Sequence, residues 1–170
     1  IRRDRATSNI CTAQVLLAVC AGFYGVWHGP EGLKRIAQYI HTQTLRLAAA
    51  AIDAGLQVQH VHFFDTIRIH APGKVDSIVS RAAEQNINLR RFNETDIVIA
   101  LDERITHDEV NTLCTILGGS SSATINDGFG IPDSLARNTP FMTHETFHRY
   151  RSETEMLRYM HQLESKDLSL

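Results

Sequence analysis

Apolar side chains are spaced in two different ways along this chain. Residues 9–27 are almost continuously apolar, and residues 30–55 place apolar side chains at intervals of three and four. Both patterns are typical of helices, and the first is typical of a helix buried on all sides. The segment HGPEG at 28–32 separates them, because Pro30 suits the first position of a new helix, which then ends at Gly55. We therefore predict two long helices before residue 56.

From residue 56 onward the apolar positions form shorter stretches. Ile67 and Ile69 alternate with Arg68 and His70, which is the pattern of a half-exposed strand. The predicted elements are a strand over 63–71, a helix over 74–86, strands over 87–92 and 96–102 joined by a tight Asn-Glu-Thr turn, and a helix over 106–119. The last two strands are predicted to form an antiparallel hairpin. This order predicts a fold of the α+β class, a small βαββα sandwich.

Two helix starts carry the signature of a capping box. Thr106 is followed three residues later by Glu109, and Ser152 is followed by Glu155. The Gly- and Ser-rich stretch between these helices shows no periodicity and is predicted to be a loop. We expect four parts: long connecting helices with an interface turn over 1–55, a small α+β domain over 56–118, a loop-rich segment over 119–151, and a C-terminal helix with the start of a linker over 152–170.

Composition narrows the class of protein without naming a function. The charge is nearly balanced, with 17 lysines and arginines against 19 aspartates and glutamates, which argues against a partner that is a nucleic acid or a membrane surface. The three cysteines have no metal-type spacing, so a reducing compartment is expected. The longest apolar stretch, Val15 to Trp27, is too short to span a bilayer.

Two patterns could carry catalytic chemistry by themselves. His60 and His62 would point to one side of a strand at a spacing that a metal ion could use, but a third ligand, His41 or His70, can be added only by assumption. The serines at 120–122 lack the strand and the glycines that surround a serine nucleophile. We therefore predict no metal site and no catalytic residue in the chain, and a metal-dependent hydrolase remains an alternative.

The stretch RRDRATSN at 2–9 places arginines and hydroxyl groups where the first helix begins. Exposed N–H groups at a helix start bind anions, and nearby arginines strengthen that attraction. The alternative interpretation is an ordinary helix cap with solvated arginines, in which Ser8 or Asn9 accepts from the first turn.

Several long stretches resemble one enzyme family. IRRDRATSNICTAQVLLAV, HGPEGLKRIA and FMTHETFHRYRSETEMLRYMHQLESKDLSL look like glycine dehydrogenase (decarboxylating), the P protein of the glycine cleavage system. The resemblance covers nearly the whole chain. It implies an α+β part of an α/β family, similar to the C-terminal small domain of a fold-type-I pyridoxal-phosphate enzyme.

The resemblance also implies a place in the enzyme. It is with the end of the N-terminal, non-catalytic half, so we expect a fragment. Lys34, Lys74 and Lys166 do not lie in a motif resembling the Schiff-base lysine, which belongs to the other half. The full enzyme is expected to decarboxylate glycine with pyridoxal phosphate and to pass the aminomethyl group to the lipoyl-carrying H protein. The isolated fragment is expected to be inactive and to bind no cofactor.

The resemblance gives the opening turn a possible role. Residues 6–9 are similar to a Gly-Thr-x-Asn turn that approaches a cofactor phosphate across an interface, so Thr7, Ser8 and Asn9 are expected to contact the phosphate held by the catalytic half. That half is therefore a partner, and the isolated chain is expected to self-associate. The location would be the cytoplasm of a bacterium or the mitochondrial matrix. Arg151 departs from the family, which more usually has His there.

A rival from another class remains. Small α+β sandwiches also bind small ligands, so a non-enzymatic binding or regulatory module is an alternative to the enzyme segment.

Overall fold

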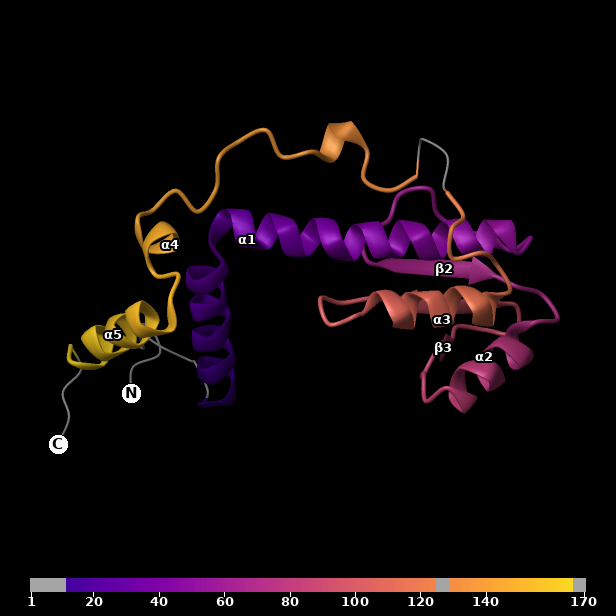
Figure 1. Ribbon diagram of the computed structural model, residues 1–170, viewed down its shortest axis with the longest axis horizontal. Helices are drawn as coiled ribbons and strands as arrows, with labels where there is room; N and C mark the ends of the chain where they lie inside the picture. The colour runs from indigo at the N-terminus through magenta and orange to yellow at the C-terminus, as the bar shows by residue number, and fades with distance from the viewer. Residues whose placement is uncertain (1–11, 125–128, 167–170) are drawn as a thin grey trace, which may run out of the picture. The chain divides into compact units, whose positions relative to one another are not determined.

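The computed structural model describes residues 12–124 and 129–166. Two compact units divide the chain: residues 35–138 form one, and the residues on both sides of them form the other. The helix α1 (Thr12–Asp53) belongs to both units (Figure 1). The division into four parts expected from the sequence stays a prediction.

The helix α1 is interrupted where the sequence predicts a break. Gly29 has a φ of 60° and a ψ of −177°, outside the helical region, and Pro30 follows it. An L-residue with a side chain rarely adopts a φ of this sign, so glycine suits the position. The two predicted helices are therefore the two halves of α1, with residues 12–28 as its first half.

The unit of residues 35–138 contains a four-stranded antiparallel sheet. Its strands lie in the order β1 (Gln57–Val58), β2 (Thr66–His70), β4 (Asp96–Ala100) and β3 (Arg90–Arg91). The helices of the same unit are α2 (Val75–Glu84) and α3 (His107–Leu117), together with the second half of α1. The order β2, α2, β3, β4, α3 confirms the predicted α+β sandwich, and the short edge strand β1 is an addition to it.

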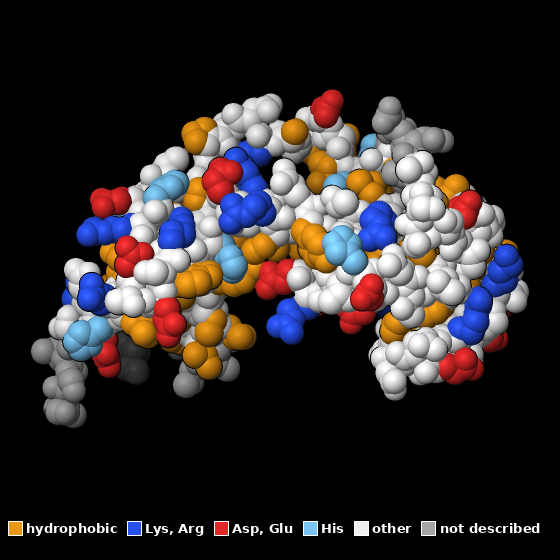
Figure 2. Space-filling model, in the orientation of Figure 1, with side chains coloured by type: hydrophobic (Ala, Val, Ile, Leu, Met, Phe, Trp, Pro, Cys, Tyr) orange, Lys and Arg blue, Asp and Glu red, His pale blue; other side chains and the backbone are white. Residues whose placement is uncertain are grey.

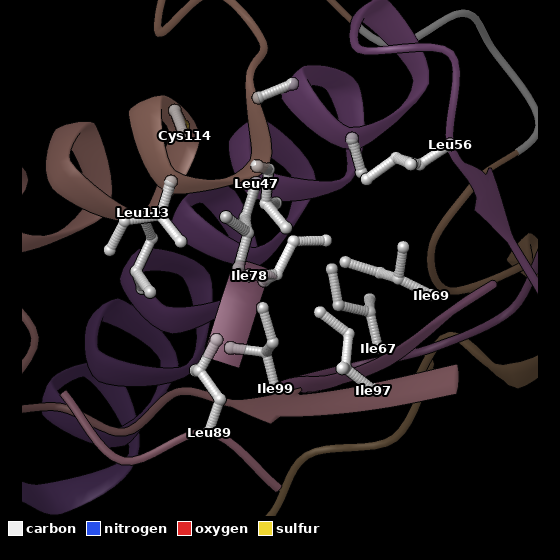
Figure 3. Packing of buried hydrophobic residues seen from close by; sticks show 14 of the residues in the cluster. Leu47, Leu56, Ile67, Ile69, Ile78, Leu89, Ile97, Ile99, Leu113 and Cys114 are labelled. Carbon is white, nitrogen blue, oxygen red and sulfur yellow. The ribbon is translucent and has the colours of Figure 1, made fainter. Parts of the chain in front are cut away.

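The core lies between the inner face of this sheet and the helices. Ile67 and Ile69 of β2 and Ile97 and Ile99 of β4 are buried, and they point toward the helical layer (Figure 3). Because side chains alternate along a strand, Arg68, His70 and Asp96 lie on the opposite face. The helices supply the other half of the core, including Leu47, Ala48, Ala50, Ala51, Val75, Ile78, Ala82, Val110, Leu113 and Cys114. The alanines of α1 let the helix approach the core closely.

Both predicted capping boxes are confirmed. The Thr106 hydroxyl accepts from the N–H of Glu109, and the Glu109 carboxylate accepts from the N–H of Thr106. Ser152 and Glu155 do the same at the start of α5 (Glu153–Glu164). The pKa of Glu109 is lowered by hydrogen bonds from the N–H and the hydroxyl of Thr106, and that of Glu155 by hydrogen bonds from the Ser152 hydroxyl and from the N–H groups of Arg151 and Ser152. The helix α3 ends at Gly118, whose φ is 90°.

The described residues between α3 and α5, 118–124 and 129–152, form only short elements. The 3-10 helix η2 (Asp133–Leu135) lies in the unit of residues 35–138, and α4 (Thr146–Arg149) lies in the other unit with α5.

Replacing Ile78 tests the core. Ile78→Ala removes a fully buried side chain from α2 and should lower the free energy of unfolding by about 2–5 kcal/mol. The control Ile52→Ala removes the same atoms from a side chain that is 43% exposed, so it should cost much less. Urea unfolding followed by circular dichroism measures both, and equal losses would contradict this description of the core.

Candidate functional site

The residues predicted to meet a cofactor phosphate, Thr7, Ser8 and Asn9, lie outside the described residues. Their role stays a prediction. The described residues begin with the helix α1, which follows this turn. The candidate functional surface is therefore sought on the unit that contains the first half of α1.

The first half of α1 is apolar and exposed. Leu16 and Leu17 are 65% and 70% exposed, and Val15 and Val19 are nearly half exposed. Figure 2 shows hydrophobic side chains gathered over this part of the helix. Soluble proteins rarely leave a continuous apolar face of this kind in water, so the face is suited to contact with another polypeptide.

A groove runs along the same helix within this unit. Its volume is about 360 Å³, and it is lined by Val19, Gly22, Phe23, Val26, His144, Thr146, Phe147, Tyr159 and Leu163. Phe23 meets the Tyr159 ring edge-on, with the ring centres 6.2 Å apart, so α5 lies beside α1 here. A Cβ added at Gly22 would meet no atom within 4 Å, which leaves that side of the helix open.

At the break in α1, backbone carbonyls lack the N–H donors that a continuous helix would supply. Pro30 has no N–H, so it cannot donate to the carbonyl of Val26 as a helical residue would. The guanidinium of Arg151 donates to this carbonyl and, at 3.2 Å, to the carbonyl of Trp27. Its other nitrogen donates to the carbonyl of Phe147 in α4. One side chain therefore satisfies carbonyls from two helices.

The backbone of Arg151 is also fixed by a hydrogen bond. The N–H groups of Arg151 and Ser152 both donate to the Glu155 carboxylate, at 3.3 Å and 3.2 Å. The capping box of α5 thus anchors the residue whose side chain reaches the break. From the sequence, Arg151 is only a departure from the family pattern, because the Val26 carbonyl that it contacts lies 125 residues away along the chain.

A second polar cluster lies on the outer face of the sheet. Asp96 is buried, and its carboxylate accepts from Arg68 at 2.6 Å and from His70 at 2.7 Å. The hydrogen bond from Arg68, followed by that from His70, lowers the pKa of Asp96 from 3.8 to about 2. The Arg68 guanidinium also lies 4.1 Å from the centre of the Phe92 ring. The cluster joins β2 to β4 and to the turn before β4.

The predicted strand around His60 and His62 is wrong. Residues 59–65 are irregular, because β1 ends at Val58 and β2 begins only at Thr66. His62 instead lies 3.2 Å from the carbonyl of Gly130. His41 contacts the carbonyl of Phe64 and His70 contacts Asp96, so these histidines have other partners. The described residues contain no group of three or more His, Cys, Asp and Glu that could hold a metal ion.

The serines at 120–122 form a turn after α3. The Ser120 hydroxyl lies 2.8 Å from the Ser122 hydroxyl, and the Ser120 N–H donates to Asp53. These contacts shape the turn and give neither hydroxyl a histidine base.

A model of the glycine cleavage system P-protein family matches residues 1–117. Relatives named glycine dehydrogenase (decarboxylating) include that of Akkermansia muciniphila, which is 47% identical, and the mitochondrial proteins of Mus musculus and Homo sapiens, each 44% identical. All three alignments cover 100% of this chain.

The chain belongs to the glycine cleavage system P-protein family. It spans only 18%, 17% and 17% of the lengths of these three relatives. Most of a P protein of that length therefore lies outside the 170 residues.

The three lysines of this P-protein segment are exposed. Lys34 has a side chain that is 53% exposed and pairs with Glu31 at 3.2 Å, and Lys74 and Lys166 are exposed as well. A lysine that reacts with an aldehyde cofactor needs an environment that keeps its amine partly neutral, which usually means burial. These lysines do not fit that requirement.

The part of the chain that the structure describes includes no helix both long enough and apolar enough to cross a membrane.

The Asp96 cluster should make stability depend on pH in a defined window. The folded pKa of about 2 lies below the unfolded value, so the ion pairs stabilise the fold fully above about pH 4 and are lost as the pH falls toward 2. Asp96→Asn should therefore be less stable than the native chain at pH 6, and the difference should shrink on acidification. Urea unfolding midpoints between pH 2 and 6 measure this.

Arg68→Gln is the matched control for the same titration. It removes the largest cause of the lowered pKa, so the acid-induced loss should still begin near pH 4 but should be smaller and should level off at a higher pH than in the native chain. A difference between the native chain and Asp96→Asn that stays constant from pH 6 to pH 2 would contradict the assignment.

Proposed function

We propose that this chain is the end of the N-terminal, lysine-free half of a glycine decarboxylase. The enzyme would decarboxylate glycine with pyridoxal phosphate and pass the aminomethyl group to a lipoyl-carrying H protein. The observation that supports this most directly is the identity of 44–47% to glycine dehydrogenases (decarboxylating) over the whole chain. The apolar face of α1 supports a place at an internal interface of the larger protein.

The covalent anchor of the cofactor is proposed to lie in the catalytic half. Pyridoxal phosphate, when bound, accepts the electron pair that is released as carbon dioxide leaves glycine. The exposed positions of Lys34, Lys74 and Lys166 do not fit an anchor for that group. We therefore derive no chemical step from this segment, and its contribution is structural and interface-forming.

The turn before α1 is proposed to touch the cofactor phosphate. Thr7, Ser8 and Asn9 offer hydroxyl, amide and backbone N–H groups at the start of a predicted helix, next to Arg2, Arg3 and Arg5. Such a helix start attracts an anion through its N–H groups and its dipole. The phosphate would be held by the other half of the enzyme, so the contact would cross an interface.

The location follows from the relatives only as a proposal. Relatives of this segment include bacterial proteins and proteins named as mitochondrial. We propose the cytoplasm for a bacterial source and the mitochondrial matrix for a eukaryotic one, and both are reducing compartments that suit the free thiols of Cys20 and Cys114.

Borohydride trapping tests where the cofactor is anchored. With stoichiometric pyridoxal phosphate, the isolated 170-residue chain should give only low and scattered modification of Lys34, Lys74 and Lys166, because no amine is buried beside a cofactor site. The longer P protein that contains this segment should be modified at one lysine outside it, and should release carbon dioxide from glycine when H protein is present. Peptide mapping by mass spectrometry gives the positions.

Near-complete modification of one of the three lysines in the isolated chain, with a spectral change on adding glycine, would contradict the assignment to a lysine-free half. A longer protein that binds pyridoxal phosphate but does not decarboxylate glycine would contradict the proposed reaction.

The isolated chain is expected to self-associate through the first half of α1. Leu17→Glu places a charge on the apolar face and should shift the sedimentation profile at micromolar concentration toward the monomer. Leu135→Glu is the matched control, because Leu135 is 73% exposed and Leu17 is 70% exposed, but Leu135 lies in the other unit. A native chain that is strictly monomeric at this concentration would contradict the expectation.

A further inference from the structure

We propose that the groove beside the first half of α1 holds an apolar helix from the part of the P protein that lies outside these 170 residues. The inference rests on the proposed function and deepens it, because it names the occupant of the interface and the residues that receive it. All the residues that line the groove belong to one unit of the chain.

The groove is closed at one end and open at the other. Val26 is only 7% exposed, whereas Val19, two turns earlier in α1, is 47% exposed. On the α5 wall, Leu163 is 37% exposed. The two helices meet through Phe23 and Tyr159, whose rings are in edge-on contact. Val19 and Leu163 are therefore apolar side chains that this contact between helices leaves partly in water.

Gly22 lies on the α1 wall of the groove, and the described residues give no packing reason for a glycine there. Its backbone is helical, and a Cβ at this position would meet no atom within 4 Å. A Cβ at Gly25, three residues later, would instead lie 3.4 Å from Cε of Met142. Glycine inside a helix is destabilising relative to alanine. A second helix whose backbone approaches α1 closely at Gly22 explains why this position lacks a side chain.

The lining of the groove determines the chemistry of its occupant. Among the described residues that line it, none is Asp, Glu, Lys or Arg. Two polar side chains of the lining contact each other: the Thr146 hydroxyl lies 3.0 Å from Nδ1 of His144, and the Thr146 N–H donates to the same atom at 3.2 Å. A charged side chain that entered the groove would lose water without gaining a partner. The face that the occupant buries is therefore apolar and uncharged.

The walls favour a helix over an extended strand. The walls formed by α1 and α5 are helical, and backbone groups inside a helix are already bonded to one another, so they offer no edge to a strand. Residues 19–26 rise about 11 Å along the axis at 1.5 Å per residue. Two turns of a second helix span this length, and they place apolar side chains against the groove at intervals of three and four.

The remainder of the P protein is the occupant that the comparisons favour. The chain spans 18%, 17% and 17% of the three relatives named above, so most of such a polypeptide lies outside it. A segment of the same polypeptide stays near the groove and binds without the loss of translational freedom that a separate molecule incurs. Permanent interfaces are also more apolar than those of partners that dissociate. The H protein has to leave after it receives the aminomethyl group, so a groove lined without charges suits it less well.

Photo-crosslinking in the longer P protein identifies the occupant. Leu163 is replaced by photo-leucine, a leucine analogue of similar size that carries a diazirine, and the irradiated protein is mapped by mass spectrometry. We expect crosslinks to one apolar helical segment of the same polypeptide outside these 170 residues, and their loss when the protein is unfolded in urea before irradiation. A mixture of isotope-labelled and unlabelled protein separates crosslinks within one polypeptide from those between copies. Crosslinks only to a second copy or to added H protein, or none outside residues 1–170, would overturn the proposal.

Gly22→Leu tests the close approach at the same groove. In the 170-residue chain the added side chain meets open space and leucine favours a helix, so the urea midpoint of unfolding should stay the same or rise. In the longer P protein the same side chain occupies space that the second helix needs, so the midpoint should fall. Ala83→Leu is the matched control, because Ala83 is exposed on α2 in the other unit, and it should lower neither midpoint. Shifts of the same sign and size in the two proteins would contradict the docking of a helix at Gly22.

Both experiments are independent of catalytic activity. If the longer protein does not decarboxylate glycine, the proposed reaction fails, whereas the crosslinks from position 163 still decide what occupies the groove. If the longer protein decarboxylates glycine but gives no crosslink outside residues 1–170, the proposed function stands and this inference fails.

Discussion

The structure depends on one constraint: the single helix α1 belongs to two units, and it is buried in one and exposed in the other. In residues 35–138, α1 presents Leu47 and a run of alanines to a core of isoleucines, and it is buried there. In the other unit its first half presents leucines and valines that the described residues leave exposed. The interruption at Gly29 and Pro30 lets one chain segment carry both surfaces without continuing one helical pattern through them.

The buried charge of Asp96 is stabilised by hydrogen-bond donors rather than by apolar packing. On the outer face of the sheet, Asp96 is buried but has three donors from Arg68, His70 and Asn93. A buried carboxylate without such partners would be strongly unfavourable, so the pairing explains how a charged residue occupies a position inside a strand. The cluster links two strands and a turn, and it belongs to the scaffold rather than to a catalytic site.

The elements that sequence predicted well are those with local causes. The capping boxes at Thr106 and Ser152 join residues three positions apart, and the glycines that end α1 and α3 act on their own backbone. The predicted strand around His60 was wrong for the opposite reason, because the contacts of this stretch are distant in sequence. Alternation over three residues does not make a strand without a partner, and this stretch is instead held by Gly130, almost seventy residues away.

The functional surface was the least predictable part, because its contacts are distant in sequence. Neither the groove between α1 and α5 nor the approach of Arg151 to Val26 leaves a periodic trace in the residues themselves. The family was recognisable from long matching stretches, and that recognition gave the Thr7–Asn9 turn its proposed role. Of the residues weighed as catalytic, His62 contacts the Gly130 carbonyl, the Ser120 N–H donates to Asp53, and the hydroxyls of Ser120 and Ser122 contact each other.

The crowding at Gly29 has a consequence for how this protein can change over evolutionary time. A side chain at position 29 would lie against the Arg151 guanidinium and the Phe147 carbonyl, so arginine at 151 requires glycine at 29. An ancestor could acquire the arginine only while glycine already held position 29, and once acquired, the arginine makes any return to a larger residue there costly. Positions 29 and 151, far apart in the chain, are therefore expected to have a shared mutational history in which the order of the changes matters.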